Sequence, residues 1–161
     1  MSAKLVVGWR EWVALPALGI PAIKAKVDTG ARTSCLHSYR LEHLREGGKD
    51  LVRFAVHPLQ ARRDLSLTCT AELLDQRLVS DSGGHRELRW VIQTTILVGN
   101  QAWPGELTLT DRDTMRFRML LGRTAMQGRI LVDPQASYLA GKQPDLPALY
   151  PQIQNNQPED P

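Results

Sequence analysis

A short polar motif, Asp28-Thr29-Gly30, offers the clearest chemistry in the chain. It closes an alternating apolar stretch over residues 22–27 and is followed by small side chains. A carboxylate at the end of a strand, followed by a glycine that permits a tight turn, can present an acid at the base of a cleft. The tripeptide occurs by chance in roughly one chain in forty of this length, so an aspartate that only initiates a β-turn remains an alternative.

Two later segments give the motif a context. Residues 80–85, Ser-Asp-Ser-Gly-Gly-His, form a polar tip between strand-like sequences and indicate a mobile hairpin. Residues 119–123, Met-Leu-Leu-Gly-Arg, are an apolar run ending in Gly-Arg, and Gly122 lies 94 residues after Asp28 (122 − 28). The order of these segments resembles that of the retropepsins. A loop that carries an aspartate comes first, a glycine-rich hairpin second, and an apolar strand that leads into Gly-Arg and a short helix last.

The resemblance narrows to one bacterial family. Residues 24–34 are similar to the signature of the retropepsin-like aspartic peptidases commonly labelled "ATP-dependent zinc protease", the glutamate-ligase-associated RimB-like group. Further blocks resemble this family at residues 82–87, 107–112, 115–123 and 131–134, so the likeness runs from about residue 6 to residue 139. The chain departs from the usual pattern at Cys35 and Ser38, where small residues such as alanine are common. Neither position belongs to the Asp-Thr-Gly core.

The resemblance implies an all-β, retropepsin-like closed β-barrel with one short C-terminal helix, and the activity of an aspartic endopeptidase. Some family members are encoded beside a ligase that adds glutamates to a ribosomal protein, and are thought to trim such tails. The substrate implied is therefore an acidic peptide or a polyglutamylated protein. The alternative is a non-catalytic retropepsin-like module that binds acidic tails or a protein partner without cleaving them.

The single copy of the motif predicts a homodimer. Hydrolysis by carboxylates requires two of them, one to deprotonate water and one to protonate the carbonyl oxygen. Asp28 of two subunits must therefore meet on a two-fold axis. Two carboxylates about 3 Å apart repel by about 5 kcal/mol at an effective dielectric near 20, which keeps one of them protonated. By resemblance, Thr29 braces the two loops through its hydroxyl and Gly30 lets them pack closely.

The arginine that follows the motif, Arg32, predicts an acidic substrate. Many retropepsins carry an aspartate directly after Asp-Thr-Gly-Ala, whereas here Ala31 is followed by a guanidinium that can hold a carboxylate in a bidentate fork. Arg112 and Arg123 extend the positive field below the hairpin. The alternative is that Arg32 or Arg123 forms a structural ion pair within the subunit, for instance with Asp111 or Asp133.

Four residues of the hairpin tip complete the predicted substrate site: Gly83, Gly84, His85 and Arg86. By resemblance the hairpin closes over the substrate and excludes water, while His85 and Arg86 add positive charge. The structural alternative is that the glycines serve only the turn.

The residues predict no metal site and no cofactor. The four histidines include no pair at i, i+4, and the chain has neither an HExxH motif nor a Gly-x-x-x-x-Gly-Lys loop, so the zinc and ATP of the family label lack support. In a strand, Cys35 and His37 would point to the same face, which could suggest a thiol nucleophile, but nothing else in the sequence completes a triad. Fifteen of the twenty cations are arginines, which permits a nucleic-acid-binding barrel. The tryptophans show no clustered arrangement for stacking bases, so a nucleic-acid partner is not expected.

Apolar patterns of period two place these residues on a framework of strands. We expect strands at residues 5–15, 20–27, 89–98, 105–110, 119–121 and 129–132, with a turn at Gly99-Asn100. A short helical turn is expected at residues 123–127, before Gly128. Between residues 42 and 77 the pattern is weaker, with strand-like sequence at 52–57 and 65–73.

A chain of 161 residues with 42% hydrophobic content can bury one good core. We expect a peptidase domain over residues 1–140, followed over residues 141–161 by a tail rich in Pro, Gln and Asn that buries no core and is disordered. No signal-peptide core follows Met1, and no run approaches the roughly 18 apolar residues of a membrane span. With two reduced thiols expected, the predicted location is the cytoplasm.

Overall fold

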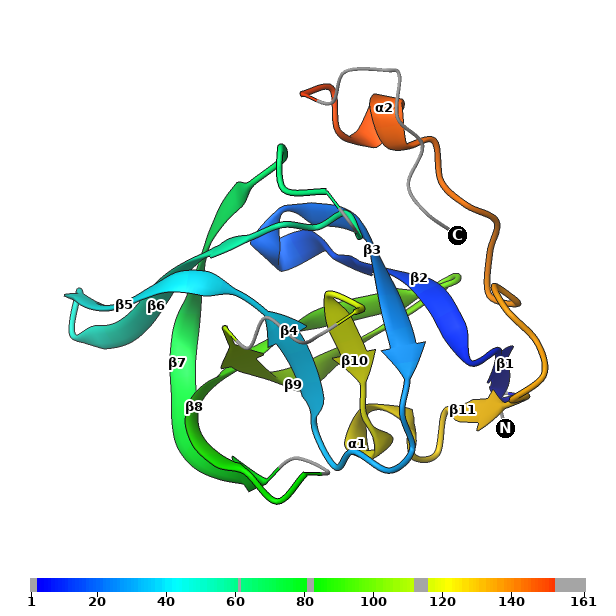
Figure 1. Cartoon of the computed structure of the whole chain (residues 1–161), viewed down its shortest axis with the longest axis horizontal. Coiled ribbons are helices and arrows are strands. Elements are labelled where there is room, and N and C mark those ends of the chain that lie inside the picture. The colour runs from blue at the N-terminus through cyan, green and yellow to red at the C-terminus, as the bar shows by residue number, and fades with distance from the viewer. Residues whose placement is uncertain (1–2, 61, 81–82, 112–115, 153–161) are drawn as a thin grey trace.

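Strands dominate the chain, as the period-two pattern predicts (Figure 1). The computed structural model describes residues 3–60, 62–80, 83–111 and 116–152. Its strands are β1 (Leu5–Val7), β2 (Arg10–Leu15), β3 (Ile20–Val27), β4 (Ser34–His37), β5 (Tyr39–Glu46), β6 (Lys49–Val56), β7 (Leu67–Ser80), β8 (Arg86–Val98), β9 (Gln101–Thr110), β10 (Met119–Leu121) and β11 (Ile130–Val132). Short helical turns are η1 (Pro16–Leu18), α1 (Arg123–Met126) and α2 (Leu146–Leu149). The mostly-β prediction is confirmed, and the closed barrel stays a prediction.

The described residues contain no helix long and apolar enough to cross a membrane. The helical turn predicted at residues 123–127 is confirmed as α1, and the turn predicted at Gly99-Asn100 joins β8 to β9.

The central feature of the sheet is β10, which lies between β3 and β4. The large sheet has the strand order β2-β3-β10-β4-β9-β8-β7-β6-β5, while β1 and β11 form a separate parallel pair. β10 runs parallel to β3, with Leu121 beside Val27, and antiparallel to β4, with Leu120 beside Cys35. Because β3 and β10 are parallel neighbours, the segments that follow them leave the sheet at the same edge.

The sheet curls back on itself through a pairing between β2 and β8, in which Val13 lies beside Val98. The long β7–β8 hairpin follows this curl down the left side of Figure 1 and ends at the lower edge of the view. The loop between β3 and β4 reaches the same edge.

Aliphatic side chains fill the main core between the curled strands. Its fully buried members include Leu15, Ile20, Ile23, Leu36, Ile92, Ile96, Leu107, Met119 and Leu121. In β3, alternation buries Ala25 and Val27 and exposes Lys26, as predicted. Lys24 differs, because it is buried with its ammonium 5.5 Å from the ring centroid of Trp12. The tryptophan face offsets part of the cost of burying that charge.

The strands of the structure differ from the predicted ones in three places. The strand expected at residues 5–15 is divided into β1 and β2 at Gly8, where the backbone passes so close to Ala136 that a Cβ would lie 2.2 Å from its carbonyl oxygen. β4 was not predicted, because all four of its residues are buried and it shows no polar alternation. β5 was also not predicted, and it pairs with β6 in a hairpin at the end of the strand order.

The segment after residue 141 contributes to a second, smaller core, so the expectation that it buries none is wrong for Leu146 and Tyr150. Both side chains are buried and pack with Trp12, Ala22 and other residues. The Tyr150 hydroxyl donates to the Ala22 carbonyl at 2.5 Å and accepts from the Ala22 amide at 3.2 Å. Composition suggested disorder, but the few apolar residues among the prolines are enough to anchor this segment on β3. The domain boundary at residue 140 stays a prediction.

A fully buried carboxylate, Glu11, holds the N-terminal strands to the segment after β11. It accepts hydrogen bonds from the amides of Gly8 at 2.6 Å, Leu139 at 2.8 Å and Ala140 at 3.0 Å. Glu11→Ala leaves these amides buried without a partner, and we expect it to lower the free energy of unfolding by about 3 kcal/mol or more. Urea denaturation measures the change.

The matched control for this prediction is Glu42→Ala, which removes the exposed cross-strand pair with Arg53 at 2.8 Å. Exposed ion pairs contribute little, so this change should cost less than about 1 kcal/mol. Equal effects of the two substitutions would contradict the assigned role of Glu11.

Candidate active site

Asp28 stands directly after β3, in a turn that its own side chain stabilises. Its Oδ1 accepts hydrogen bonds from the amides of Gly30 at 3.0 Å and Ala31 at 3.2 Å. The Asp28 amide donates to the carbonyl of Leu121, the last residue of β10, at 2.9 Å. Hydrogen bonds therefore hold the half-buried carboxylate to the turn that follows it and the backbone of Asp28 to β10.

The loop that follows Asp28 is held by residues directly after β10. The Gly122 amide donates to the Ser34 hydroxyl at 2.9 Å, and the Arg123 amide donates to the Ala31 carbonyl at 2.8 Å. The Arg123 guanidinium reaches the Thr29 carbonyl at 3.0 Å. The two blocks singled out in the sequence, 94 residues apart (122 − 28), thus form one structural unit. We call residues 28–34 the acidic loop.

The remaining predicted residues of the acidic loop face solvent. Thr29, Gly30 and Arg32 are exposed, and Ala31 is half-buried. Arg123 is also exposed, although its guanidinium already serves the Thr29 carbonyl. A contact with substrate by these side chains stays a prediction.

The predicted glycine-rich hairpin is the β7–β8 hairpin. Gly83, Gly84, His85 and Arg86 are exposed near its tip, and Gly84 adopts a φ of +83° that favours glycine. Arg86 pairs in register with Ser80. Tip and acidic loop both reach the lower edge of Figure 1. The hairpin is confirmed, and its role as a cover over substrate stays a prediction.

Arg112 falls outside the residues that the structure describes. Its predicted contribution to substrate binding remains untested.

Cys35 lies on β4 beside an arginine. The Arg89 guanidinium donates to its Sγ at 3.5 Å. Burial raises the pKa of the Cys35 thiol, although the nearby charge of Arg89 acts against that rise. A raised pKa disfavours the thiolate that a nucleophile requires. Burial likewise raises the pKa of the Cys69 thiol to about 11, and both cysteines are free.

Among the described residues, no group of three or more His, Cys, Asp or Glu side chains is placed to hold a metal ion.

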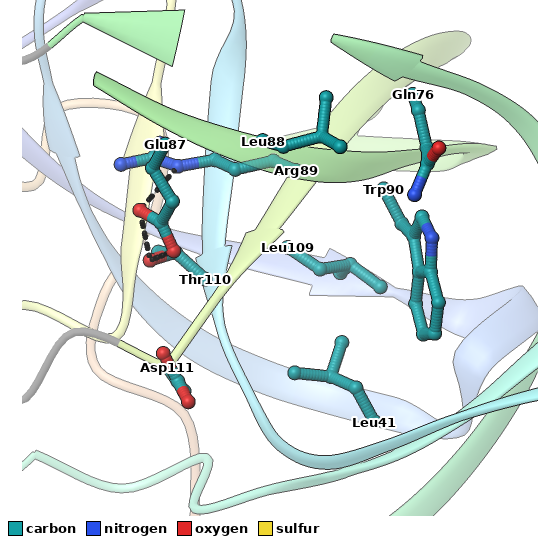
Figure 2. A pocket seen from close by; sticks show the side chains of 9 residues that line it. All are labelled: Leu41, Gln76, Glu87, Leu88, Arg89, Trp90, Leu109, Thr110 and Asp111. Carbon is teal, nitrogen blue, oxygen red and sulfur yellow. Dashed lines mark hydrogen bonds and ion pairs between the residues drawn. The ribbon is translucent and has the colours of Figure 1, made fainter. Parts of the chain in front are cut away.

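A cavity of about 320 Å³ lies against the half of the β7–β8 hairpin nearer its tip (Figure 2). Its lining comprises Leu41, Gln76, Glu87, Leu88, Arg89, Trp90, Leu109, Thr110 and Asp111. Glu87 accepts from the Thr110 hydroxyl at 3.1 Å and from Arg89 Nε at 3.0 Å, which ties the hairpin to the end of β9. The lining includes no residue of the acidic loop. Sequence reasoning did not find this cavity, because its residues come from four strands without a shared motif.

Comparison with known proteins places the chain among retropepsin-like proteins. A family model described as "Retropepsin-like aspartic endopeptidase RimB" matches residues 6–143. Proteins named probable alpha-L-glutamate ligase are similar: that of Shewanella pealeana is 47% identical over 143 residues, and that of Parasynechococcus marenigrum is 46% identical over 152 residues. These alignments cover 89% and 93% of this chain but 31% and 33% of the relatives, so the chain spans about a third of their length.

A solved structure is also similar. The Legionella pneumophila protein Lpg0085, of unknown function, aligns with a TM-score of 0.70 at 23% identity, over 86% of this chain and 99% of that chain. At this identity the likeness shows the fold alone.

Proposed function

Since the chain belongs to the RimB-like family of retropepsin-like aspartic endopeptidases, we propose that it hydrolyses peptide bonds with a pair of Asp28 carboxylates. The observation that carries this proposal is the turn at Asp28, where two amides hold Oδ1 and the residues after β10 hold the following loop. Acid–base catalysis needs a carboxyl group kept in a fixed orientation. A second copy of the chain supplies the second carboxylate across a two-fold axis.

The proposed reaction follows from two carboxyls that share one proton. The ionised Asp28 takes a proton from water, which attacks the substrate carbonyl carbon, and the protonated Asp28 of the second copy donates to the carbonyl oxygen. Collapse of the tetrahedral intermediate breaks the C–N bond, with a proton passed to the leaving amine. In the proposed dimer, Thr29 and Gly30 form the contact between the two loops, and the β7–β8 hairpin excludes water from the site.

We propose that the substrate is an acidic, glutamate-rich extension of a protein. Arg32 is exposed on the acidic loop, and Arg86 and His85 are exposed near the hairpin tip. Exposed guanidinium groups bind carboxylates in a bidentate manner. The relatives are named glutamate ligases, and this chain matches only about a third of their length. Their names agree with a substrate to which glutamates have been added.

The test compares hydrolysis of an oligoglutamate peptide with that of a neutral peptide of equal length. We expect kcat/KM to be at least about tenfold higher for oligoglutamate, because one hydrogen-bonded charge contact contributes about 1.5–3 kcal/mol. The preference should shrink in high salt, which screens exposed charges. Equal rates, or a preference for the neutral peptide, would refute the proposal that the substrate is acidic. Binding of oligoglutamate without cleavage would favour the non-catalytic module.

A further inference from the structure

An ion pair joins the hairpin to β9. Arg77 of β7 donates through Nη1 to Glu106 Oε1 at 2.7 Å and through Nη2 to Oε2 at 3.0 Å. Its Nε donates to Asp75 Oδ2 at 2.9 Å. One guanidinium therefore holds two carboxylates, with the bidentate edge on Glu106. The side chains of Arg77 and Glu106 are 37% and 35% exposed, so a dissolved anion can reach the pair.

This ion pair stands beside the acidic loop. β4 and β9 run parallel with Ser34 beside Leu107, so Glu106 lies level with the point where the acidic loop enters β4. The hydrogen bonds from Arg77 hold the pKa of the Glu106 carboxyl below its ordinary value, and the charge of Arg32 adds to this effect. Glu106 thus lies in the combined field of two arginines, one from the hairpin and one from the acidic loop.

We propose that Glu106 occupies, in the unliganded protein, the position of a substrate carboxylate on Arg77, and that an acidic substrate displaces it. This inference rests on the proposed acidic substrate and adds Arg77 to its binding site. The guanidinium fork accepts any carboxylate of suitable orientation. Exchange costs little because the substrate carboxylate forms the same two hydrogen bonds to Arg77, while the displaced Glu106 carboxylate is partly exposed to water. Asp75 keeps Nε of Arg77 in place during the exchange.

The competing explanation is a purely structural tie that holds the hairpin against β9. The two explanations predict different directions of change in the affinity for an acidic peptide. If Glu106 competes with substrate, its removal strengthens binding of an acidic peptide, whereas removal of Arg77 weakens it. If the pair only holds the hairpin against β9, removal of either Arg77 or Glu106 loosens the hairpin. The two removals then change the binding of the acidic peptide in the same direction.

The experiment measures binding of fluorescent hexaglutamate to the full chain by anisotropy, in an Asp28→Asn background that prevents cleavage. We expect Glu106→Gln to lower Kd about threefold, within the range of an exposed ion pair. Arg77→Gln should raise Kd about threefold or more. Neither change should alter the weak binding of a hexaglutamine peptide with the same label.

The controls remove the same charges from a similar pair elsewhere. Arg53 and Glu42 form an exposed pair at 2.8 Å between β5 and β6, so Glu42→Gln and Arg53→Gln report the effect of net charge alone. Shifts equal to those of the controls, shifts of one sign for Glu106→Gln and Arg77→Gln, or no binding of hexaglutamate would overturn the inference. Opposite shifts of Kd, together with a wild-type chain that cleaves no peptide, would support the binding site at Arg77 and refute the proposed peptidase activity.

Discussion

Asp28→Asn is expected to reduce peptide hydrolysis by at least about 10²-fold without unfolding the protein. An amide can neither accept a proton from water nor donate one in the manner of a carboxyl, and general acid–base catalysis contributes about 10²–10⁴-fold. The fold should survive, because the Oδ1 of asparagine can still accept from the amides of Gly30 and Ala31, as the carboxylate does at 3.0 and 3.2 Å. A peptide-cleavage assay and a thermal melt measure the two effects.

Asp133→Asn is the matched control for this prediction. Asp133 also accepts a backbone hydrogen bond in a turn, from the Gln135 amide at 3.0 Å, but it lies outside the candidate site. It should leave hydrolysis unchanged. Cleavage at the wild-type rate by the Asp28 variant would refute the carboxylate pair. Inhibition by pepstatin together with indifference to a chelator would further distinguish aspartic chemistry from the zinc of the family label.

Gly122→Ala is expected to destabilise the protein by about 3 kcal/mol and to lower its activity about 10²-fold. A Cβ on Gly122 would lie 2.5 Å from the Thr33 carbonyl carbon and 2.7 Å from the Ser34 amide. These are backbone atoms and cannot rotate away, so the acidic loop must move. That movement breaks the hydrogen bond from the Gly122 amide to the Ser34 hydroxyl, and it displaces the loop that carries Asp28.

Gly141→Ala provides the comparison, since no heavy atom lies within 4 Å of the position of its Cβ. Urea denaturation and the cleavage assay should show near wild-type behaviour for Gly141→Ala and losses of both stability and activity for Gly122→Ala. If Gly122→Ala unfolds the chain outright, circular dichroism will show it, and the close packing is then supported by stability alone. Unchanged stability would contradict the packing of the acidic loop against residue 122.

Local pattern determined much of the fold. β3 and β10 begin and end where the sequence predicts, because their apolar runs are bounded by polar or glycine residues that end a strand within one or two positions. The helical turn before Gly128 and the β8–β9 turn follow for the same reason, since a glycine with positive φ or a Gly-Asn pair specifies backbone geometry within a few residues. The Asp28 motif and the Gly122-Arg123 block were also recognisable as separate segments.

Only the tertiary structure decided how these segments combine. Insertion of β10 between β3 and β4 brings Gly122 onto the acidic loop, and strand order brings Arg77 against Glu106, although no local pattern links either pair. β4 lacks alternation because neighbours bury both of its faces, and Tyr150 is anchored by the backbone of a strand 128 residues away. The periodicity of apolar residues shows only which face of a single strand or helix is buried. Contacts between distant segments depend on sheet order and side-chain reach, which that periodicity does not encode.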